Sequence, residues 1–154
     1  VHGAQARAAS DWGVLVMTAA ARGIGQAVEA TGLATVAALA IESVASDLGV
    51  LGTLVLLYAV TNILAELVTN KAAVALMFPV AISVALDLGA DPKAFALAIT
   101  VGSAASFLTP IGYQTNLMVM GAGRYRYTDY TKAGLVLSLL IMAVTVSVVA
   151  WRWL

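Results

Sequence analysis

The stretch Glu66-Leu-Val-Thr69-Asn70-Lys71-Ala-Ala73 decides the fold, because it places a run of polar side chains between two apolar segments. The flanking segments are Val50–Leu67 and Ala72–Leu86. Both are shorter than the roughly 20 residues that a straight helix needs to cross a bilayer. A polar tip at membrane depth is tolerated only where protein or a water-filled cavity receives its backbone groups. The pattern therefore predicts a re-entrant helical hairpin over residues 50–87.

The composition indicates a membrane protein. Of the 154 residues, 62% are hydrophobic and 10% are charged, whereas soluble domains have about 45–50% and 25%. Eight Lys and Arg balance eight Asp and Glu, so nothing attracts nucleic acid. The chain has no cysteine, one histidine (His2), no nucleophile beside a base and no cluster of metal ligands. We therefore expect neither an enzyme nor a cofactor.

The remaining apolar segments predict an all-α membrane protein with a single membrane domain over residues 1–154. The segment at 31–49 has a polar side, which favours an arm or interfacial helix. Tryptophans border the last apolar segment, as in an interfacial belt. The full expectation is a transmembrane helix at 12–28, the arm helix at 31–49, the hairpin at 50–87, a broken helix at 93–121 and a last transmembrane helix at 132–153.

A charge inside the first predicted span requires a partner carboxylate, a cavity or the water interface, and this charge belongs to Arg22. We assign it no role. Near the other end of the chain, a cluster of basic residues favours a cytoplasmic location for its loop under the positive-inside rule. The cluster consists of Arg124, Arg126 and Lys132.

A second polar interruption runs from Ser103 to Asn116. Pro110 and Gly112 within it are strong helix breakers. The interruption predicts a discontinuous helix whose unwound stretch forms an ion site. The alternative is a proline-kinked transmembrane helix without transport function. Four polar residues in succession over 113–116 exceed what a kink requires, and they favour a functional site.

The hairpin tip offers groups for both an anion and a cation. Thr69 and Asn70 carry oxygens suited to a hard cation such as Na⁺. The backbone N–H groups near Ala72 and Ala73 would attract an anion, and Lys71 would add a full positive charge. The alternative is an exposed loop in which Asn caps the next helix and Lys reaches the headgroups.

The carboxylate that precedes the tip has three open roles. Glu66 could ligate an ion or relay a proton. It could instead pair with Lys71 near an aqueous boundary, or it could brace the hairpin. Its place on the same helix, three residues before Thr69, favours the bracing role.

Taken together, the motifs resemble the C-terminal half of the divalent anion/sodium symporters, the DASS permeases. The resemblance rests on the run from Glu66 to Pro79, followed by Thr109-Pro-Ile-Gly-Tyr-Gln-Thr-Asn116 and Gly121-Ala-Gly-Arg-Tyr-Arg-Tyr. It implies an elevator carrier built from two inverted repeats, of which this chain is the second. It also implies a homodimer in the plasma (inner) membrane and a missing N-terminal repeat as a partner.

The resemblance also implies site residues. Thr69-Asn70-Lys71 stands where the family has Ser-Asn-Thr, and Asn116 matches the Asn of the family's Thr-Pro-Pro-Asn stretch; Lys71 departs from the pattern. The Thr-Pro-Ile-Gly-Tyr-Gln-Thr-Asn form resembles a branch associated with sulfate and other inorganic oxyanions. The expected substrate ligands are Thr69, Asn70, Lys71, Gln114, Thr115 and Asn116, and the expected ion ligands are Thr69, Asn70, Gly112, Tyr113 and Asn116.

The expected function is ion-coupled secondary transport of a small divalent anion, such as sulfate or a dicarboxylate, with Na⁺ as the expected coupling ion. The alternative is a channel or structural membrane subunit whose polar helix breaks line a pore. A channel would conduct without dependence on an ion gradient.

Overall fold

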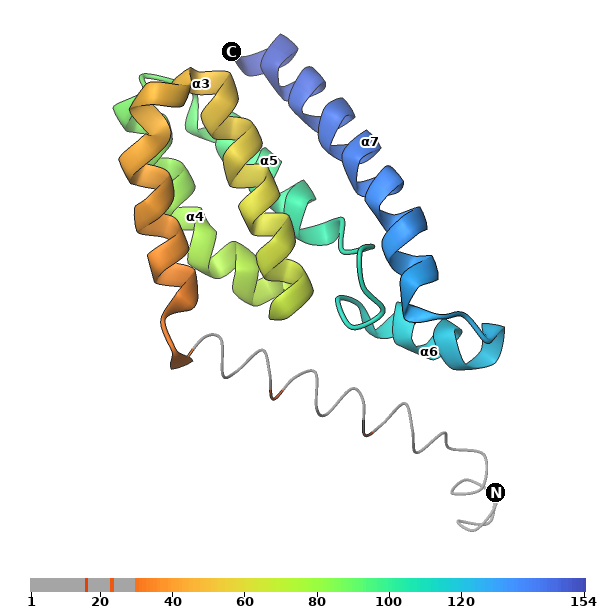
Figure 1. Cartoon of the computed structure of the whole chain (residues 1–154). Coiled ribbons are helices and arrows are strands. Elements are labelled where there is room, and N and C mark those ends of the chain that lie inside the picture. The colour runs from red at the N-terminus through yellow and green to blue at the C-terminus, as the bar shows by residue number, and fades with distance from the viewer. Residues whose placement is uncertain (1–15, 17–22, 24–29) are drawn as a thin grey trace, which may run out of the picture.

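The computed structural model describes Val16, Gly23 and residues 30–154, apart from several side chains between Leu33 and Ser46. The predicted span at 12–28, apart from Val16 and Gly23, lies outside the described residues, as does Arg22. From residue 33 onward every regular element is a helix, as the sequence predicts (Figure 1). The helices are α3 (Leu33–Leu67), α4 (Asn70–Asp87), α5 (Pro92–Ala104), α6 (Gln114–Gly123) and α7 (Tyr127–Trp153).

Helix α3 consists of two antiparallel arms joined at Gly49. This residue has a φ of 66°, a left-handed conformation that glycine adopts without steric cost. The chain reverses there, so residues 33–48 lie beside the second arm (Figure 1). The reversal comes at the residue where the sequence predicts the arm segment 31–49 to end. Its location at a membrane interface stays a prediction.

The core lies among the second arm of α3, α4 and α5, which pack against one another. α7 packs along α5 and α3. Gly102 allows close packing of α5 on α3, because a Cβ atom at this position would lie 3.1 Å from the carbonyl oxygen of Tyr58. The largest fully buried apolar side chains are Tyr58, Phe95, Leu54, Leu57, Met77 and Ile99.

Three helices in the described part of the chain are long and apolar enough to cross a membrane: Asp47–Leu67, Asn70–Asp87 and Tyr127–Trp153. The expectation that both hairpin segments are too short to span is therefore wrong as an argument from length. Polar residues that look like loop in the sequence are helical here, because Asp47, Asn70 and Asp87 lie within the ends of these helices. A re-entrant hairpin therefore requires its tip to lie within the membrane, which helix length does not decide.

Helix ends follow local capping chemistry. The Asp91 carboxylate accepts from the Lys93 N–H at 2.9 Å and begins α5. The Asp129 carboxylate accepts from the Arg126 N–H at 2.8 Å, which starts α7 at Tyr127. This start is five residues before the predicted 132, because a carboxylate in the first turn stabilises polar residues as helix.

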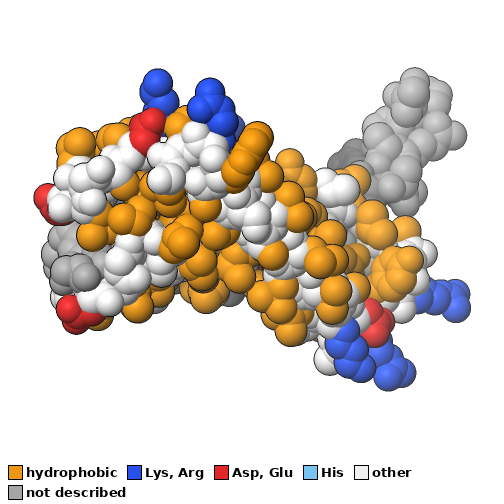
Figure 2. All heavy atoms as spheres, turned by 90° about the horizontal axis from the view of Figure 1, so that it is seen from above, with side chains coloured by type: hydrophobic (Ala, Val, Ile, Leu, Met, Phe, Trp, Pro, Cys, Tyr) orange, Lys and Arg blue, Asp and Glu red, His pale blue; other side chains and the backbone are white. Residues whose placement is uncertain are grey.

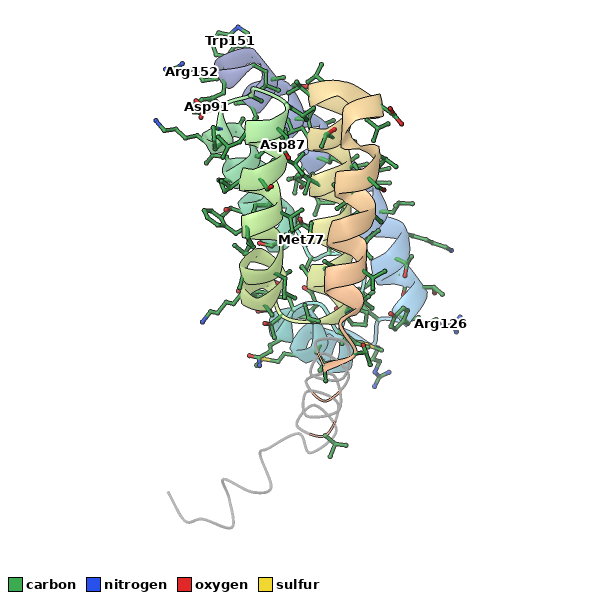
Figure 3. All side chains as sticks on the ribbon, turned by 90° about the vertical axis from the view of Figure 1, so that its left-hand side faces the viewer. Met77, Asp87, Asp91, Arg126, Trp151 and Arg152 are labelled. Carbon is green, nitrogen blue, oxygen red and sulfur yellow. The ribbon has the colours of Figure 1, made fainter. Side chains whose placement is uncertain are left out.

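Hydrophobic side chains are spread over the face seen in Figure 2, and charged side chains stand at its margins. Figure 3 shows Asp87, Asp91, Trp151 and Arg152 at one end of the molecule and Arg126 at the opposite end, with Met77 between them. An apolar middle zone between two polar ends is what a bilayer requires of a protein that crosses it. This distribution agrees with the three helices that are long and apolar enough to cross a membrane.

Candidate functional site

The hairpin tip consists of Val68 and Thr69, which connect α3 to α4. Thr69 is the N-cap of α4: its Oγ1 accepts from the Ala72 N–H at 3.2 Å, and its carbonyl accepts from the Ala73 N–H at 2.8 Å. The expectation that the amides near Ala72 and Ala73 face an anion is therefore wrong, because Thr69 binds both. The amides that remain at the start of α4 are those of Asn70 and Lys71.

The helix break lies between α5 and α6 and covers residues 105–113. Pro110 within it is buried. Two carbonyl oxygens at the end of α5, those of Gly102 and Ala105, accept from Asn62 Nδ2, each at 2.9 Å. A side chain of α3 thus satisfies backbone groups that the unwinding leaves without helical partners.

Glu66 joins the hairpin to the break. Its carboxylate accepts from the Leu108 N–H at 2.8 Å, the Thr109 N–H at 3.1 Å and the Thr109 hydroxyl at 2.7 Å. The side chain is only 7% exposed, so these donors replace the water that it loses on burial. Lys71 is exposed, and within residues 30–154 no ion pair joins it to Glu66. Of the three roles left open by the sequence, the geometry matches the bracing role.

A hydrogen-bond chain brings the two predicted asparagines together through Ser106. The Ser106 hydroxyl lies 3.2 Å from Asn70 Oδ1 and 3.1 Å from the Ser103 carbonyl oxygen, and it can donate to either. Asn116 Nδ2 donates to the carbonyl oxygen of Ser106 at 3.1 Å, with a longer contact of 3.4 Å to that of Thr109. Asn70 of the hairpin and Asn116 of the broken helix therefore belong to one polar cluster.

The other predicted residues lie at the edge of this cluster. Gly112 packs so closely on the Glu66 carboxylate that a Cβ atom would collide with it, and its N–H donates to Thr109 Oγ1 at 3.0 Å. Tyr113, Gln114 and Thr115 are exposed at the start of α6. The Tyr113 carbonyl accepts from the Asn116 N–H at 3.0 Å, so that oxygen is already used by the helix.

The residue-based prediction missed Ser106 and Thr109 as members of the site. Both belong to the second interruption, and with Ser103 they recur every third residue up to Pro110. Three polar side chains at helical spacing before a proline form a signal that could have identified them. Asn62 carried no such signal, because it lies inside an apolar helix and outside both polar interruptions.

The helix break packs against α7 at two positions. The Ser138 hydroxyl lies 3.4 Å from the Ala105 carbonyl oxygen, and a Cβ atom at Gly134 would collide with the Phe107 carbonyl. At 1.5 Å per residue, Gly134 lies about 10 Å and Ser138 about 16 Å from the start of α7, a helix about 40 Å long. The break at Ala105 and Phe107 therefore lies beside the first half of α7.

Helices long enough to cross a membrane around two joined polar breaks are typical of integral membrane transporters. The chain belongs to the sodium:sulfate symporter family: the family profile for the sodium:sulfate symporter transmembrane region matches residues 5–154.

Relatives of known description agree with the family. Sodium/sulfate cotransporter 1 of Chlamydomonas reinhardtii is 38% identical over 149 residues, which are 96% of this chain and 17% of the relative. Sodium/sulfate cotransporter 2 of the same organism is 39% identical over 141 residues, 91% of this chain and 16% of the relative. An uncharacterized transporter of Synechocystis is 37% identical over 134 residues, 87% of this chain and 22% of the relative. The chain thus spans less than a quarter of each of these relatives.

Proposed function

We propose that this chain forms the second half of a sodium-coupled secondary transporter that carries a small divalent anion, with sulfate as the first candidate, across the plasma membrane. The observation that carries the proposal is the polar cluster of Asn70, Ser106 and Asn116, which joins the hairpin to the helix break. The names of the two Chlamydomonas relatives support sulfate and Na⁺.

In this proposal the two asparagines bind opposite charges. Asn70 Oδ1 faces the Ser106 hydroxyl, which leaves its NH₂ group to donate to an oxygen of the anion. Asn116 uses its NH₂ group on backbone carbonyls, which leaves its Oδ1 for a cation. Thr69 and the carbonyl group of Gly112 complete the sodium ligands, and Lys71, Gln114 and Thr115 lie on the side of the anion.

The coupling of the two ions follows from electrostatics. An anion held within the hydrocarbon zone is costly unless a cation compensates its charge. Two helix N-termini, those of α4 and α6, contribute partial positive charge, and Na⁺ contributes a full one. Joint binding therefore lowers the free energy of moving the loaded site across the membrane.

The proposal includes the assembly that the symporter family implies. In this assembly the hairpin is re-entrant, and the contact between Asn70 and Ser106 joins its tip to the helix break. The missing N-terminal repeat supplies the other half of the site, and two copies form a homodimer. The bonds from Glu66 to the break support movement of the hairpin and broken helix as one unit in an elevator mechanism.

The proposal is tested by uptake of labelled sulfate and labelled succinate into proteoliposomes that contain the full-length protein, with and without a Na⁺ gradient. We expect gradient-driven accumulation of sulfate, and we expect Asn70→Ala to abolish it. Ser83→Ala, an exposed change on α4, is the matched control and should transport normally. Equally fast uptake without a gradient, insensitive to Asn70→Ala, would contradict the proposal and indicate a channel; succinate uptake without sulfate uptake would identify a dicarboxylate carrier.

A further inference from the structure

An apolar groove of about 380 Å³ lies beside the break, between α6 and the first turns of α7. A pocket of this volume is large enough to bind part of a small molecule. Its two polar lining side chains already have partners: Asn116 donates to backbone carbonyls, and Asp129 accepts from the Arg126 N–H. The apolar surface of the groove comes from Phe107, Val119, Tyr125, Tyr130, Ala133 and Leu137.

Three cations adjoin, in the sequence, residues that line this groove. Arg124 and Arg126 flank Tyr125, which lines the groove, and Lys132 precedes Ala133. All three cations are exposed, and Asp129 is the one acidic residue between Leu117 and Trp151. Figure 2 shows Lys and Arg side chains gathered at one end of the molecule around a single acidic group. This end of the molecule therefore carries an excess of positive charge.

These cations lie toward one end of the apolar helix α7. Figure 3 places Arg126 at the opposite end of the molecule from Trp151 and Arg152, so α7 enters the apolar zone near Arg126. Tyr125 and Tyr127 are half exposed here, and tyrosines are enriched at the headgroup level of bilayers. The apolar groove extends from this level along α7 toward Leu137.

We propose that this groove binds an anionic phospholipid, with its phosphate at Arg124 and Arg126 and part of an acyl chain along Phe107, Val119 and Leu137. A guanidinium group binds phosphate oxygens through paired N–H donors. Basic clusters beside a membrane helix attract anionic lipids, and an apolar groove continuous with them suits a chain that is already in the bilayer.

Bound lipid would contact the transport site through one side chain. Tyr130 lines the groove, and its hydroxyl donates to the Asn116 carbonyl oxygen at 2.9 Å. Tyr125 packs edge-on against Tyr130 with ring centroids 6.0 Å apart. A lipid between α6 and α7 would therefore pack against Tyr130, whose hydroxyl is bonded to Asn116.

The test measures binding of phosphatidylglycerol and of phosphatidylcholine with the same acyl chains to the full-length protein in detergent, by native mass spectrometry. We expect phosphatidylglycerol to bind more tightly. Arg124→Gln with Arg126→Gln should weaken it by about 25-fold, at about five-fold for each cation. Lys93→Gln with Arg152→Gln, a matched loss of two exposed cations elsewhere in the described chain, should leave it unchanged.

A second variant tests the groove itself. Ala133→Trp fills the groove with an exposed side chain, and it should abolish binding of both lipids while the protein remains folded by circular dichroism. The inference is overturned if the two lipids bind equally, if the arginine variant binds phosphatidylglycerol as the unchanged protein does, or if Ala133→Trp has no effect. Because no transport is measured, these outcomes are independent of the proposed function.

Discussion

At the scale of the residue, one buried carboxylate holds two distant segments together. Glu66 belongs to α3, yet its three hydrogen-bond donors come from Leu108 and Thr109. These donors include two backbone N–H groups of an unwound stretch, which would otherwise lack acceptors in an apolar environment. Glu66 therefore stabilises the shape of the break as well as its position.

Replacement of the carboxylate by an amide should be destabilising. In Glu66→Gln the new NH₂ group faces donors, so at least one of the three bonds is lost and a buried N–H stays unsatisfied. We expect a loss of about 1–3 kcal/mol in the free energy of unfolding, measured by denaturant titration of the full-length protein in detergent. Asp87→Asn, an exposed carboxylate at a helix end, should change it by less than about 0.5 kcal/mol. Equal stability of the two variants would show that Glu66 does not brace the site.

Ser106 permits a finer test of the asparagine cluster. Ser106→Ala removes the hydroxyl next to Asn70 Oδ1 but retains the carbonyl that Asn116 binds. With Asn70 less well oriented, we expect the KM for the anion to rise about 2- to 12-fold, which corresponds to one hydrogen bond of about 0.5–1.5 kcal/mol. Uptake kinetics measure this effect, with Ser83→Ala as control. An unchanged KM would separate Ser106 from substrate binding.

At the scale of the element, α7 fixes the position of the helix break. Gly134 lies against the Phe107 carbonyl, and Ser138 contacts the Ala105 carbonyl oxygen one turn further along the helix. A small residue and a hydroxyl at this spacing let an unwound backbone approach a membrane-spanning helix closely. The packing of α7 thus places irregular backbone where it is covered by protein.

Added volume at this contact should separate the two elements. Gly134→Ala introduces a Cβ atom where the Phe107 carbonyl lies, and we expect a cost of about 1–3 kcal/mol from overpacking. Thermal unfolding of the full-length protein measures it. Ala143→Val adds volume on an exposed part of α7 and should be tolerated. If Gly134→Ala is as stable as this control, α7 does not press on the break.

At the scale of the whole molecule, much of the surface of α7 and the start of α6 is not covered by other parts of this chain. Only 22% of the most apolar stretch of α7 is buried inside the structure. Tyr113, Gln114 and Thr115 are also exposed, although they begin a helix next to the polar cluster. Such polar groups need protein or water opposite them if they lie at membrane depth.

The isolated segment of 154 residues should therefore fail to work alone. We expect it to aggregate in detergent and to show no sulfate uptake in proteoliposomes, because polar side chains next to the cluster are exposed in it. Size-exclusion chromatography and uptake assays measure both properties. Co-expression with the remainder of the full-length protein should restore a monodisperse preparation. A monodisperse, transport-competent preparation of the segment alone would refute the expectation.

The sequence by itself indicated an all-helical membrane protein and located the two polar breaks. Long apolar runs, Pro110, Gly112 and the polar tip act locally, so their effects can be read without knowledge of neighbours. Helix ends were less certain, because Asn70 and Asp129 can be loop or first-turn residues according to their hydrogen bonds.

Only the tertiary structure decided which distant groups meet. Glu66 lies more than forty residues from the amides that it binds, and Ser106 links Asn70 to Asn116. These contacts depend on how α3, α5 and α7 pack. The sequence of an apolar helix face does not identify the helix against which it packs. Local chemistry therefore predicted where polar groups occur, whereas helix packing decided that they form one site.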